Sequence, residues 1–200
     1  MSNLGLLGFT NFDTIFHSHD EDEIIANPLQ VIDFPMVGVS SALTPEVQHW
    51  SEDITRWASE FGLDPNLISV VMQIESCGHP SVQSSAGALG LFQVMPYHFE
   101  AGEDPLNPQT NAHRGLSYLA RSFELSNGRI DLTLAGYNGG HGVIDRKADA
   151  WPTETRRYVR WGVTILDDIS RGETTSPHLD EWLAAGGASL CSRAASALEQ

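Results

Sequence analysis

Glu75 is the residue in this sequence whose surroundings best suit chemistry. It is the only carboxylate in residues 65–99, a stretch that also lacks Lys and Arg, in a chain with 26 acidic residues. Ile68, Val71 and Met72 precede it at helical spacing, so we expect Glu75 to share their apolar face. A carboxyl group in apolar surroundings has a raised pKa and can act as an acid near neutral pH. A helix-terminal glutamate that faces solvent fits the same residues equally well.

Gln93 lies in a segment with little side-chain bulk. Gly87 and Gly90 precede it, and Pro96 follows it. Backbone without bulky side chains can approach a ligand closely, so this segment is a candidate binding loop. Because an ordinary structural loop also needs one or two glycines, the pattern alone is weak evidence for a site.

Two further segments place polar side chains where helices are expected to end or begin. Tyr137 and Asn138 precede Gly139-Gly140, so a hydroxyl and an amide could point into a cleft at this break. Helix C-caps have the same composition. Glu154 begins another helix, with Tyr158 one turn later, and an acidic residue there also stabilises the helix dipole. Taken singly, neither segment requires a function.

Taken together and in order, four motifs resemble those of the soluble lytic transglycosylase family, which has a lysozyme-like, mainly helical domain of the glycoside hydrolase family 23 type. The spacing between the motifs also fits, and the resemblance covers about residues 45–170. The departures, Phe92 and two glycines of the third motif, touch no position expected to do chemistry. The motifs are Glu75-Ser76, Gly87-Ala88-Leu89-Gly90-Leu91-Phe92-Gln93-Val94-Met95-Pro96, Ala135-Gly136-Tyr137-Asn138-Gly139-Gly140 and Glu154-Thr155-Arg156-Arg157-Tyr158-Val159.

The resemblance implies a role for each matching residue. Glu75 corresponds to the catalytic acid and base of the family. The other matching positions are Ser84, Gln93 and Met95, which would line the site near the cleaved bond, Tyr137 and Asn138, which would lie beside the glutamate and the sugar, and Glu154 and Tyr158, which would support the site or contact substrate.

Enzymes of this family cleave the MurNAc-β-1,4-GlcNAc bond of peptidoglycan without water and leave a 1,6-anhydroMurNAc product. Protonated Glu75 would donate to the glycosidic oxygen, and the resulting carboxylate would then take the proton of the C6 hydroxyl. Most glycosidases use a second carboxylate. None lies near Glu75 in the sequence, although Glu154 or Asp145 could approach it in the folded chain. The alternatives are a hydrolytic goose-type muramidase that uses the same glutamate and a non-catalytic wall-binding or assembly module.

The net charge of −15 limits the partners of the chain. Nucleic acid needs a basic face, and anionic membranes or anionic wall polymer would not attract this chain by charge. We expect a monomer that binds peptidoglycan glycan strands by shape and hydrogen bonds, without a cofactor, a metal or insertion into a membrane. His17 and His19 beside the acidic cluster Asp20-Glu21-Asp22-Glu23 could bind a metal, but a solvated tail is the simpler interpretation because no further ligand follows at useful spacing.

The composition indicates one core with an appendage at each end. A content of 41% hydrophobic residues in 200 residues is enough for one sizeable domain. Residues 1–43 contain no Lys or Arg and predict a mostly irregular, acidic tail. Residues 44–172 carry all the motifs and form the expected catalytic domain, and residues 173–200 form an expected helical extension packed on it.

Helix start and stop signals predict that the domain is mainly α. Thr44-Pro45 and Asp64-Pro65 each combine a cap with Pro at the first helical position, and Gly62 is a stop signal. Residues 81–104 lack helical periodicity and should be loop with short strands or single turns. The expected helices are 45–61, 65–76, 108–126, 132–137 with Asp131 as its cap, 142–148 and 153–170.

Cys77 and Cys191 are either two free thiols or one disulfide. No apolar run is long enough to span a membrane, and Met1–Phe12 lacks the basic region and the cleavage site of a signal peptide. Because peptidoglycan lies outside the cytoplasmic membrane, the resemblance implies an extracytoplasmic protein, in the periplasm, in the cell wall or secreted. In such an oxidising compartment we favour the disulfide, which would place the C-terminal segment beside the site and stabilise the fold by roughly 4 to 5 kcal/mol.

Overall fold

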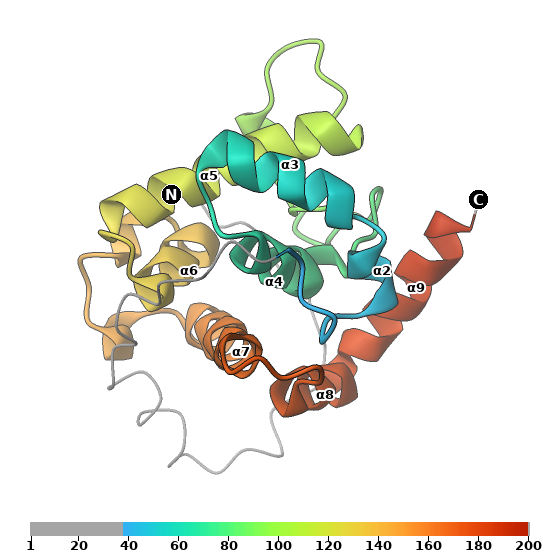
Figure 1. Ribbon diagram of the computed structural model, residues 1–200. Helices are drawn as coiled ribbons and strands as arrows, with labels where there is room; N and C mark the ends of the chain where they lie inside the picture. Colours follow the sequence, from blue (N-terminus) through green and yellow to red (C-terminus); the bar gives the residue numbers. More distant parts are fainter. Residues whose placement is uncertain (1–37, 200) are drawn as a thin grey trace.

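Helix α4, Pro65–Ser76, lies at the centre of the part of the chain that the structure describes, residues 38–199 of a computed structural model (Figure 1). All of its 12 residues are buried. A single apolar face was expected, but the helix is covered on every side, which is typical of a helix in the core of a domain. Glu75 is therefore enclosed by the fold as well as by its neighbours in sequence.

The other helices surround α4. Helices α5, α6 and α7 pack in sequence against one another, and α3 and α7 contact α4 directly. The helices are α2 (Pro45–Gln48), α3 (Ser51–Phe61), α5 (Pro108–Leu125), α6 (Ile130–Gly139), α7 (Thr153–Ser170), α8 (Pro177–Trp182) and α9 (Ala188–Leu198), with single turns η1 (Pro96–His98), η2 (His141–Val143) and η3 (Ala148–Ala150) and a π-helical segment η4 (Leu183–Gly187).

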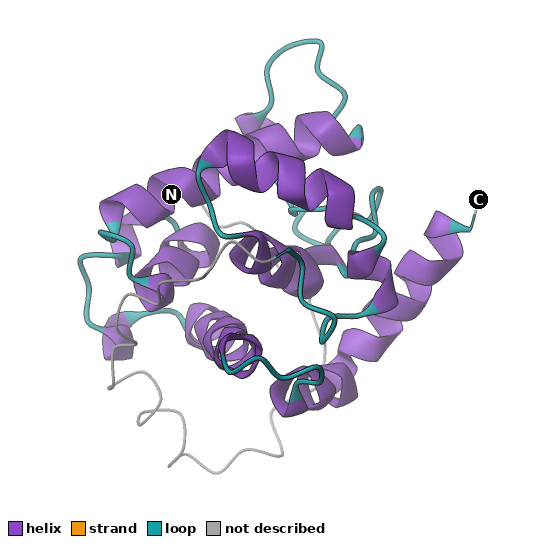
Figure 2. Cartoon of the chain, in the orientation of Figure 1, coloured by secondary structure: helices purple, strands orange, loops and turns teal. Residues whose placement is uncertain are grey.

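The mainly α prediction is confirmed, and so is the loop predicted for residues 81–104. Within residues 38–199 the β structure is limited to two isolated bridges, Gln83 with Leu89 and Leu89 with Val94 (Figure 2). The predicted helix signals act at several ends. Asp64 accepts hydrogen bonds from the N–H groups of Asn66 and Leu67, and Gly62 ends α3 in the left-handed conformation with φ of 64°.

The helix predicted for residues 45–61 is wrong in one respect, because it divides into α2 and α3 around Trp50. Thr44 stands at the N-cap position of α2, but its side chain makes no capping hydrogen bond. Its hydroxyl instead donates to Gln73 Oε1 of α4, at 3.1 Å. A contact with the central helix has replaced the local cap.

Two other local predictions are also wrong. Asp131 lies in the first turn of α6 and pairs with Arg129 at 2.6 Å, while Arg129 occupies the N-cap position. A carboxylate there still favours the helix dipole. The helix expected for residues 142–148 is replaced by the turns η2 and η3.

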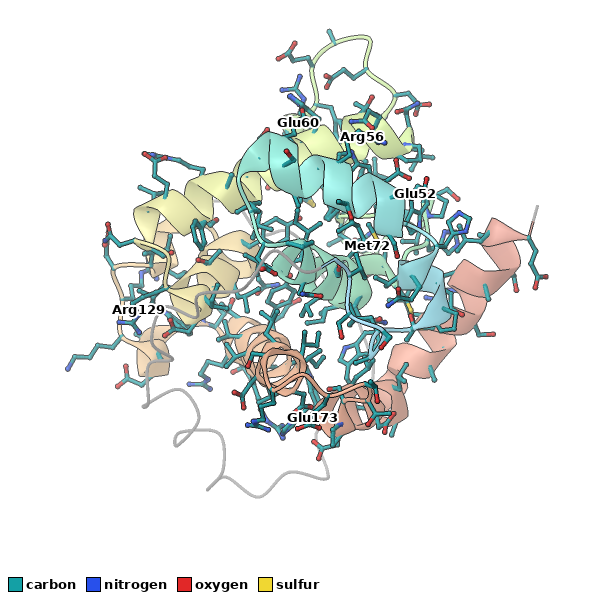
Figure 3. The ribbon with its side chains drawn as sticks, in the orientation of Figure 1. Glu52, Arg56, Glu60, Met72, Arg129 and Glu173 are labelled. Carbon is teal, nitrogen blue, oxygen red and sulfur yellow. A yellow bond between two sulfur atoms is a disulfide. The ribbon has the colours of Figure 1, made fainter. Side chains whose placement is uncertain are left out.

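Most of the interior is apolar, although a few carboxyl groups such as Glu75 and Asp168 are buried in it. Met72 of α4 is fully buried among the helices, whereas Arg56 and Glu60 project from the outer face of α3 (Figure 3). None of the helices in residues 38–199 is both long and apolar enough to cross a membrane. The expectations for the tail of residues 1–37, including His17, His19 and the acidic cluster 20–23, lie outside the described residues.

Candidate active site

Glu75 occupies the last turn of α4 and is 1% exposed. Burial raises the pKa of its carboxyl group to about 8, the facing hydroxyl of Tyr158 lowers it, and the negative charge of Glu154 raises it further. Loss of hydration disfavours the charged form of a carboxyl group, which explains the direction of the shift. Glu75 is therefore protonated at neutral pH and can donate a proton.

Tyr158 brings helix α7 to the same place. Its side chain is 1% exposed, and burial followed by the charge of Glu75 raises the pKa of its hydroxyl well above the ordinary value. Within residues 38–199, neither Tyr158 Oη nor Glu75 Oε1 meets full hydrogen-bond geometry with a partner. The neutral phenol of Tyr158 and the neutral carboxyl group of Glu75 thus face each other, and each can still form a hydrogen bond with a ligand.

Gln93 is fully buried in the loop that follows α4, with a φ of 46°. This left-handed conformation is uncommon for a residue other than Gly. Its side-chain Nε2 donates to the carbonyl groups of Gly90 at 2.9 Å and Val82 at 3.2 Å, which fixes the amide. Its Oε1 is buried and has no partner in the described part of the chain.

Tyr137 and Asn138 lie near the end of α6, and both are buried. Tyr137 Oη donates to the carbonyl oxygen of Phe92 at 2.7 Å, so its hydroxyl holds the loop that carries Gln93. The charge of Glu75 contributes to the raised pKa of Tyr137, after burial. Asn138 Nδ2 is buried without a hydrogen-bond partner among residues 38–199.

The remaining predicted residues are placed differently from one another. Ser84 is buried, and its Oγ accepts a hydrogen bond from the N–H of Ala88 at 2.9 Å, so it shapes the loop. Met95 is partly buried and packs against the core. Glu154 is exposed in the first turn of α7 and acts on Glu75 through its charge. The structure thus brings the predicted segments together around Glu75, while Ser84 serves the loop itself.

Asn111 of α5 is a site-building residue that the sequence analysis did not identify. Its Oδ1 accepts from the N–H of Phe92 at 2.9 Å, and its Nδ2 donates to the carbonyl groups of Leu89 at 2.8 Å and Pro105 at 2.9 Å. A Cβ atom on Gly90 would lie 2.5 Å from Asn111 Nδ2. Gly90 therefore makes room for this amide, where the sequence suggested room for a ligand.

A row of aromatic and histidine rings beside Tyr137 was also missed. Tyr118 contacts Tyr137 with ring centroids 6.0 Å apart, and it stacks on His141 at 4.1 Å and contacts His98 at 5.2 Å. Tyr97, which is 57% exposed, extends the row outward from His98. Burial lowers the pKa of both His98 and His141, so the two imidazoles are neutral at neutral pH.

One cluster in the described residues has the spacing of metal ligands. The ligand atoms of Glu46, Cys77 and Cys191 lie within 4.8 Å of one another. Both sulfur atoms belong to one disulfide bond, so neither is a thiolate that could bind a metal ion.

The order and placement of these segments agree with a comparison against protein families. The family described as Transglycosylase SLT domain matches residues 52–158, a span that includes Glu75, Gln93, Tyr137 and Tyr158. The chain belongs to this family. The Transglycosylase SLT domain thus accounts for the mainly helical fold and for the four motifs by which the sequence resembled lytic transglycosylases.

Named relatives of this SLT domain come from a phage and from bacteria. The chain is 30% identical over 111 residues to the transglycosylase of Enterobacteria phage PRD1, covering 54% of this chain and 40% of that protein. It is 33% identical over 142 residues to the membrane-bound lytic murein transglycosylase C of Histophilus somni, covering 60% and 38%. The chain thus spans about two fifths of the length of these curated relatives.

A solved structure also resembles this SLT domain. It is the X-ray structure of an inactive mutant of the lytic transglycosylase Slt from Pseudomonas aeruginosa, with 24% identity and a TM-score of 0.49, covering 62% of this chain and 24% of that chain.

Proposed function

We propose that the chain is a peptidoglycan lytic transglycosylase that cleaves the MurNAc-β-1,4-GlcNAc bond with Glu75 as its single general acid and base. The observation that carries this proposal is the burial of Glu75, which raises its pKa to about 8 and keeps it protonated at neutral pH. A glycosidic oxygen needs such a proton donor to leave. The names of the relatives, lytic murein transglycosylase among them, support the same substrate.

Unpartnered polar atoms on the predicted residues support a saccharide ligand. Buried polar atoms in folded proteins are normally hydrogen-bonded. The hydroxyl and acetamido groups of a sugar would supply hydrogen-bond donors and acceptors to the buried polar atoms of the site that lack a partner. These atoms are Gln93 Oε1 and Asn138 Nδ2, which have no partner within residues 38–199, and Glu75 Oε1 and Tyr158 Oη, which belong to facing groups but do not meet full hydrogen-bond geometry.

The proposed reaction uses the carboxyl group of Glu75 twice. First, its proton goes to the glycosidic oxygen as the bond from C1 to that oxygen breaks, and the 2-acetamido group of the substrate stabilises C1. The carboxylate then removes the proton of the C6 hydroxyl, whose oxygen bonds to C1 and closes the 1,6-anhydro ring. Glu75 ends protonated again, and no water is consumed. Glu154 is exposed and raises the pKa of Glu75, so it favours the protonated acid.

The ring row offers a place for the glycan strand outside the reacting bond. Tyr97, His98, Tyr118 and His141 present neutral rings with polar edges, which suits sugar faces and hydroxyl groups. Because these rings are neutral, they neither repel nor attract a charged glycan strand by charge. We place the protein outside the cytoplasmic membrane because its proposed substrate lies there, and we propose that it acts as a monomer.

The product profile of wild type and Glu75→Gln tests this function. Purified peptidoglycan should yield anhydromuropeptides with wild type, and the yield should fall by about 100- to 10,000-fold with Glu75→Gln. Glu60→Gln, the same change at an exposed position of α3, is the matched control and should retain full activity. Near-wild-type activity of Glu75→Gln would show that the catalytic assignment is wrong.

Mass spectrometry of the products separates the two enzymatic alternatives. The anhydro product is lighter by one water than the product of a hydrolytic muramidase. A non-catalytic wall-binding module would release neither product. The outcome identifies the nucleophile, C6 hydroxyl or water, that completes the reaction of Glu75.

A further inference from the structure

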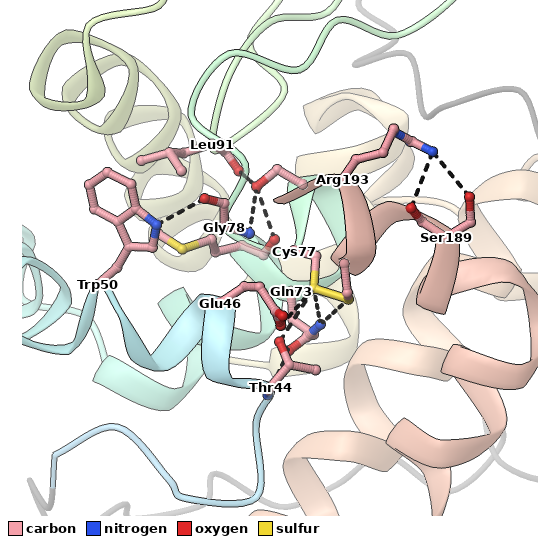
Figure 4. The surroundings of a disulfide bond; sticks show 12 residues. Thr44, Glu46, Trp50, Gln73, Cys77, Gly78, Leu91, Ser189 and Arg193 are labelled. Carbon is pink, nitrogen blue, oxygen red and sulfur yellow. Dashed lines mark hydrogen bonds between the residues drawn. A yellow bond between two sulfur atoms is a disulfide. The ribbon is translucent and has the colours of Figure 1, made fainter. Parts of the chain in front are cut away.

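The backbone turn that follows Glu75 is held from several sides. Ser76 Oγ donates to the carbonyl oxygen of Leu91 at 2.7 Å, and Trp50 Nε1 donates to the carbonyl oxygen of Gly78 at 2.9 Å. A Cβ atom on Gly78 would lie 2.6 Å from the carbonyl oxygen of Glu46, so α2 packs directly on this turn. Figure 4 shows these contacts converging on the end of α4.

A disulfide between Cys77 and Cys191 adds a covalent link to the same turn. Cys77 ends α4 with a φ of 51°, and the bond joins it to α9 with a Cα to Cα distance of 5.0 Å. Within α9 the buried residues are Leu190, Cys191 and Ala194. These three residues belong to the hydrophobic core, and the disulfide adds a covalent attachment of α9 to α4.

Gln73 connects the disulfide to the start of the domain. Its Nε2 donates to Cys77 Sγ at 3.0 Å and to Cys191 Sγ at 3.5 Å, while its Oε1 accepts from the N–H and the hydroxyl of Thr44 at 3.2 and 3.1 Å. Gln73 is fully buried. It lies two residues before Glu75 and therefore on the opposite side of the helix. The side chain and the disulfide thus support α4 from behind the candidate site.

The carboxyl group of Glu75 is faced by the Tyr158 hydroxyl, and its Oε1 lacks a hydrogen-bond partner in the described part of the chain. The location and burial of this carboxyl group therefore depend largely on the backbone at the end of α4 that carries it. A change of about 1 Å in the placement of a catalytic group can cost about 100-fold in rate.

We propose that the Cys77–Cys191 disulfide and Gln73 are positioning elements that hold Glu75 in its buried place, so that the bond serves turnover as well as stability. The expected effect of the disulfide on the reaction rate rests on the proposed function. The expected effect of the disulfide on the burial of Glu75 does not depend on that function. Without the bond, α9 can leave the back of α4, and water can reach the turn.

The test compares the 200-residue chain with its Cys77→Ala/Cys191→Ala variant. A carbon-13 NMR titration of glutamate carboxyl groups, with Glu75 assigned by Glu75→Gln, measures the pKa of Glu75 in each. We expect the pKa in the variant to fall by about one unit or more, because water reduces the desolvation that raises it. On peptidoglycan, kcat should fall about 10-fold, with KM changed less than about twofold. A second variant, Gln73→Leu, keeps the bond and should shift the pKa in the same direction.

Asp168→Asn provides a control for general destabilisation. Asp168 of α7 accepts hydrogen bonds from Ser176 Oγ at 2.6 Å and His178 Nδ1 at 2.9 Å, far along α7 from Tyr158. The Asp168→Asn substitution should lower the melting temperature while leaving kcat and the pKa of Glu75 unchanged. An unchanged pKa in both Cys77→Ala/Cys191→Ala and Gln73→Leu would overturn the inference. If wild type releases no product, the proposed function fails, and the titration still decides whether the bond keeps Glu75 buried.

Discussion

At the scale of single residues, the carboxyl group of Glu75 links chemistry to stability. Its pKa is about 8 in the folded chain, against 4.5 for an ordinary glutamate. Between these pH values the folded state binds a proton that the unfolded state has lost, so the free energy of unfolding falls as pH rises. Below pH 4.5 Glu75 is protonated in both states, and above pH 8 the free energy of unfolding has lost the whole contribution of this proton.

Glu75→Gln should remove this pH dependence. Urea denaturation at about pH 5 and about pH 9 should show the variant gaining stability relative to wild type, by up to about 5 kcal/mol across the range. Glu60→Gln, at an exposed position, should follow wild type at both pH values. A constant difference between Glu75→Gln and wild type would mean that Glu75 titrates in its ordinary range.

Tyr158→Phe tests the hydroxyl that opposes this effect. The Tyr158 hydroxyl lowers the pKa of Glu75, so its removal should raise that pKa and move the alkaline limit of activity to higher pH. The measurement is kcat/KM against pH for both proteins. An alkaline limit that moves to lower pH would contradict the facing arrangement of the two groups.

The sequence offered a raised pKa for Glu75 as one of two equal alternatives, because a long stretch without another charge fits a buried or a solvent-facing carboxyl group. Burial at the end of α4, which only the fold shows, decides between them. The row of Tyr97, His98, Tyr118 and His141 could not be predicted, since its rings come from η1, α5 and η2. Each ring is unremarkable in its own segment. Their stacking arises only when α5 and the end of α6 pack together.

At the scale of elements, Asn111 of α5 determines where the loop after α4 lies. Asn111→Ala would leave the buried N–H of Phe92 without its partner and would release the carbonyl groups of Leu89 and Pro105, of which that of Leu89 still accepts from the N–H of Val94. An unsatisfied buried group costs about 1–3 kcal/mol, so we expect a loss of about that size in the free energy of unfolding. Chemical denaturation measures the loss, and kcat/KM should fall with it because Gln93 lies on this loop.

Asn107→Ala is the matched control on the same helix. Asn107 caps α5 by accepting from the N–H groups of Gln109 and Thr110, at 3.0 and 3.1 Å, and is exposed. Loss of a cap costs about 1 kcal/mol and should leave the loop in place. Equal losses of activity in the two variants would mean that helix stability, rather than the clamp on the loop, controls the site.

Helix ends were predictable where a residue acts on its own backbone. Asp64 and Asn107 cap α4 and α5 as their types predict. The prediction failed at Thr44, whose hydroxyl bonds to Gln73 of another helix, and at Asp131, which pairs with Arg129. At Thr44 a side-chain partner far along the chain replaced the local cap, and sequence spacing carries no information about such a partner. At Asp131 the helix begins earlier than predicted, with Arg129 at the N-cap position.

At the scale of the whole molecule, the order of the motifs revealed the family, and packing supplied what their spacing could not. The disulfide joins residues 114 positions apart, and it meets α4 beside the turn of Glu75. The compartment implied by the family resemblance favoured this bond without indicating that Gln73 would contact both sulfur atoms. The net charge of −15 is a property of the whole chain and not of any single contact. It affects how the whole molecule approaches a charged substrate.

This charge predicts an unusual salt response of the proposed activity. Anionic wall polymer repels a chain of net charge −15, and salt screens that repulsion, so KM on intact wall should fall as ionic strength rises from about 0.01 M to about 0.15 M. A neutral, peptide-free glycan oligomer is the control, and its KM should stay constant because neutral rings and hydrogen bonds hold the sugar. Turbidity assays on wall and product counts on the oligomer give both values. A KM on wall that rises with salt would show that a local basic surface captures the polymer, against the neutral binding surface inferred from Tyr118, His98 and His141.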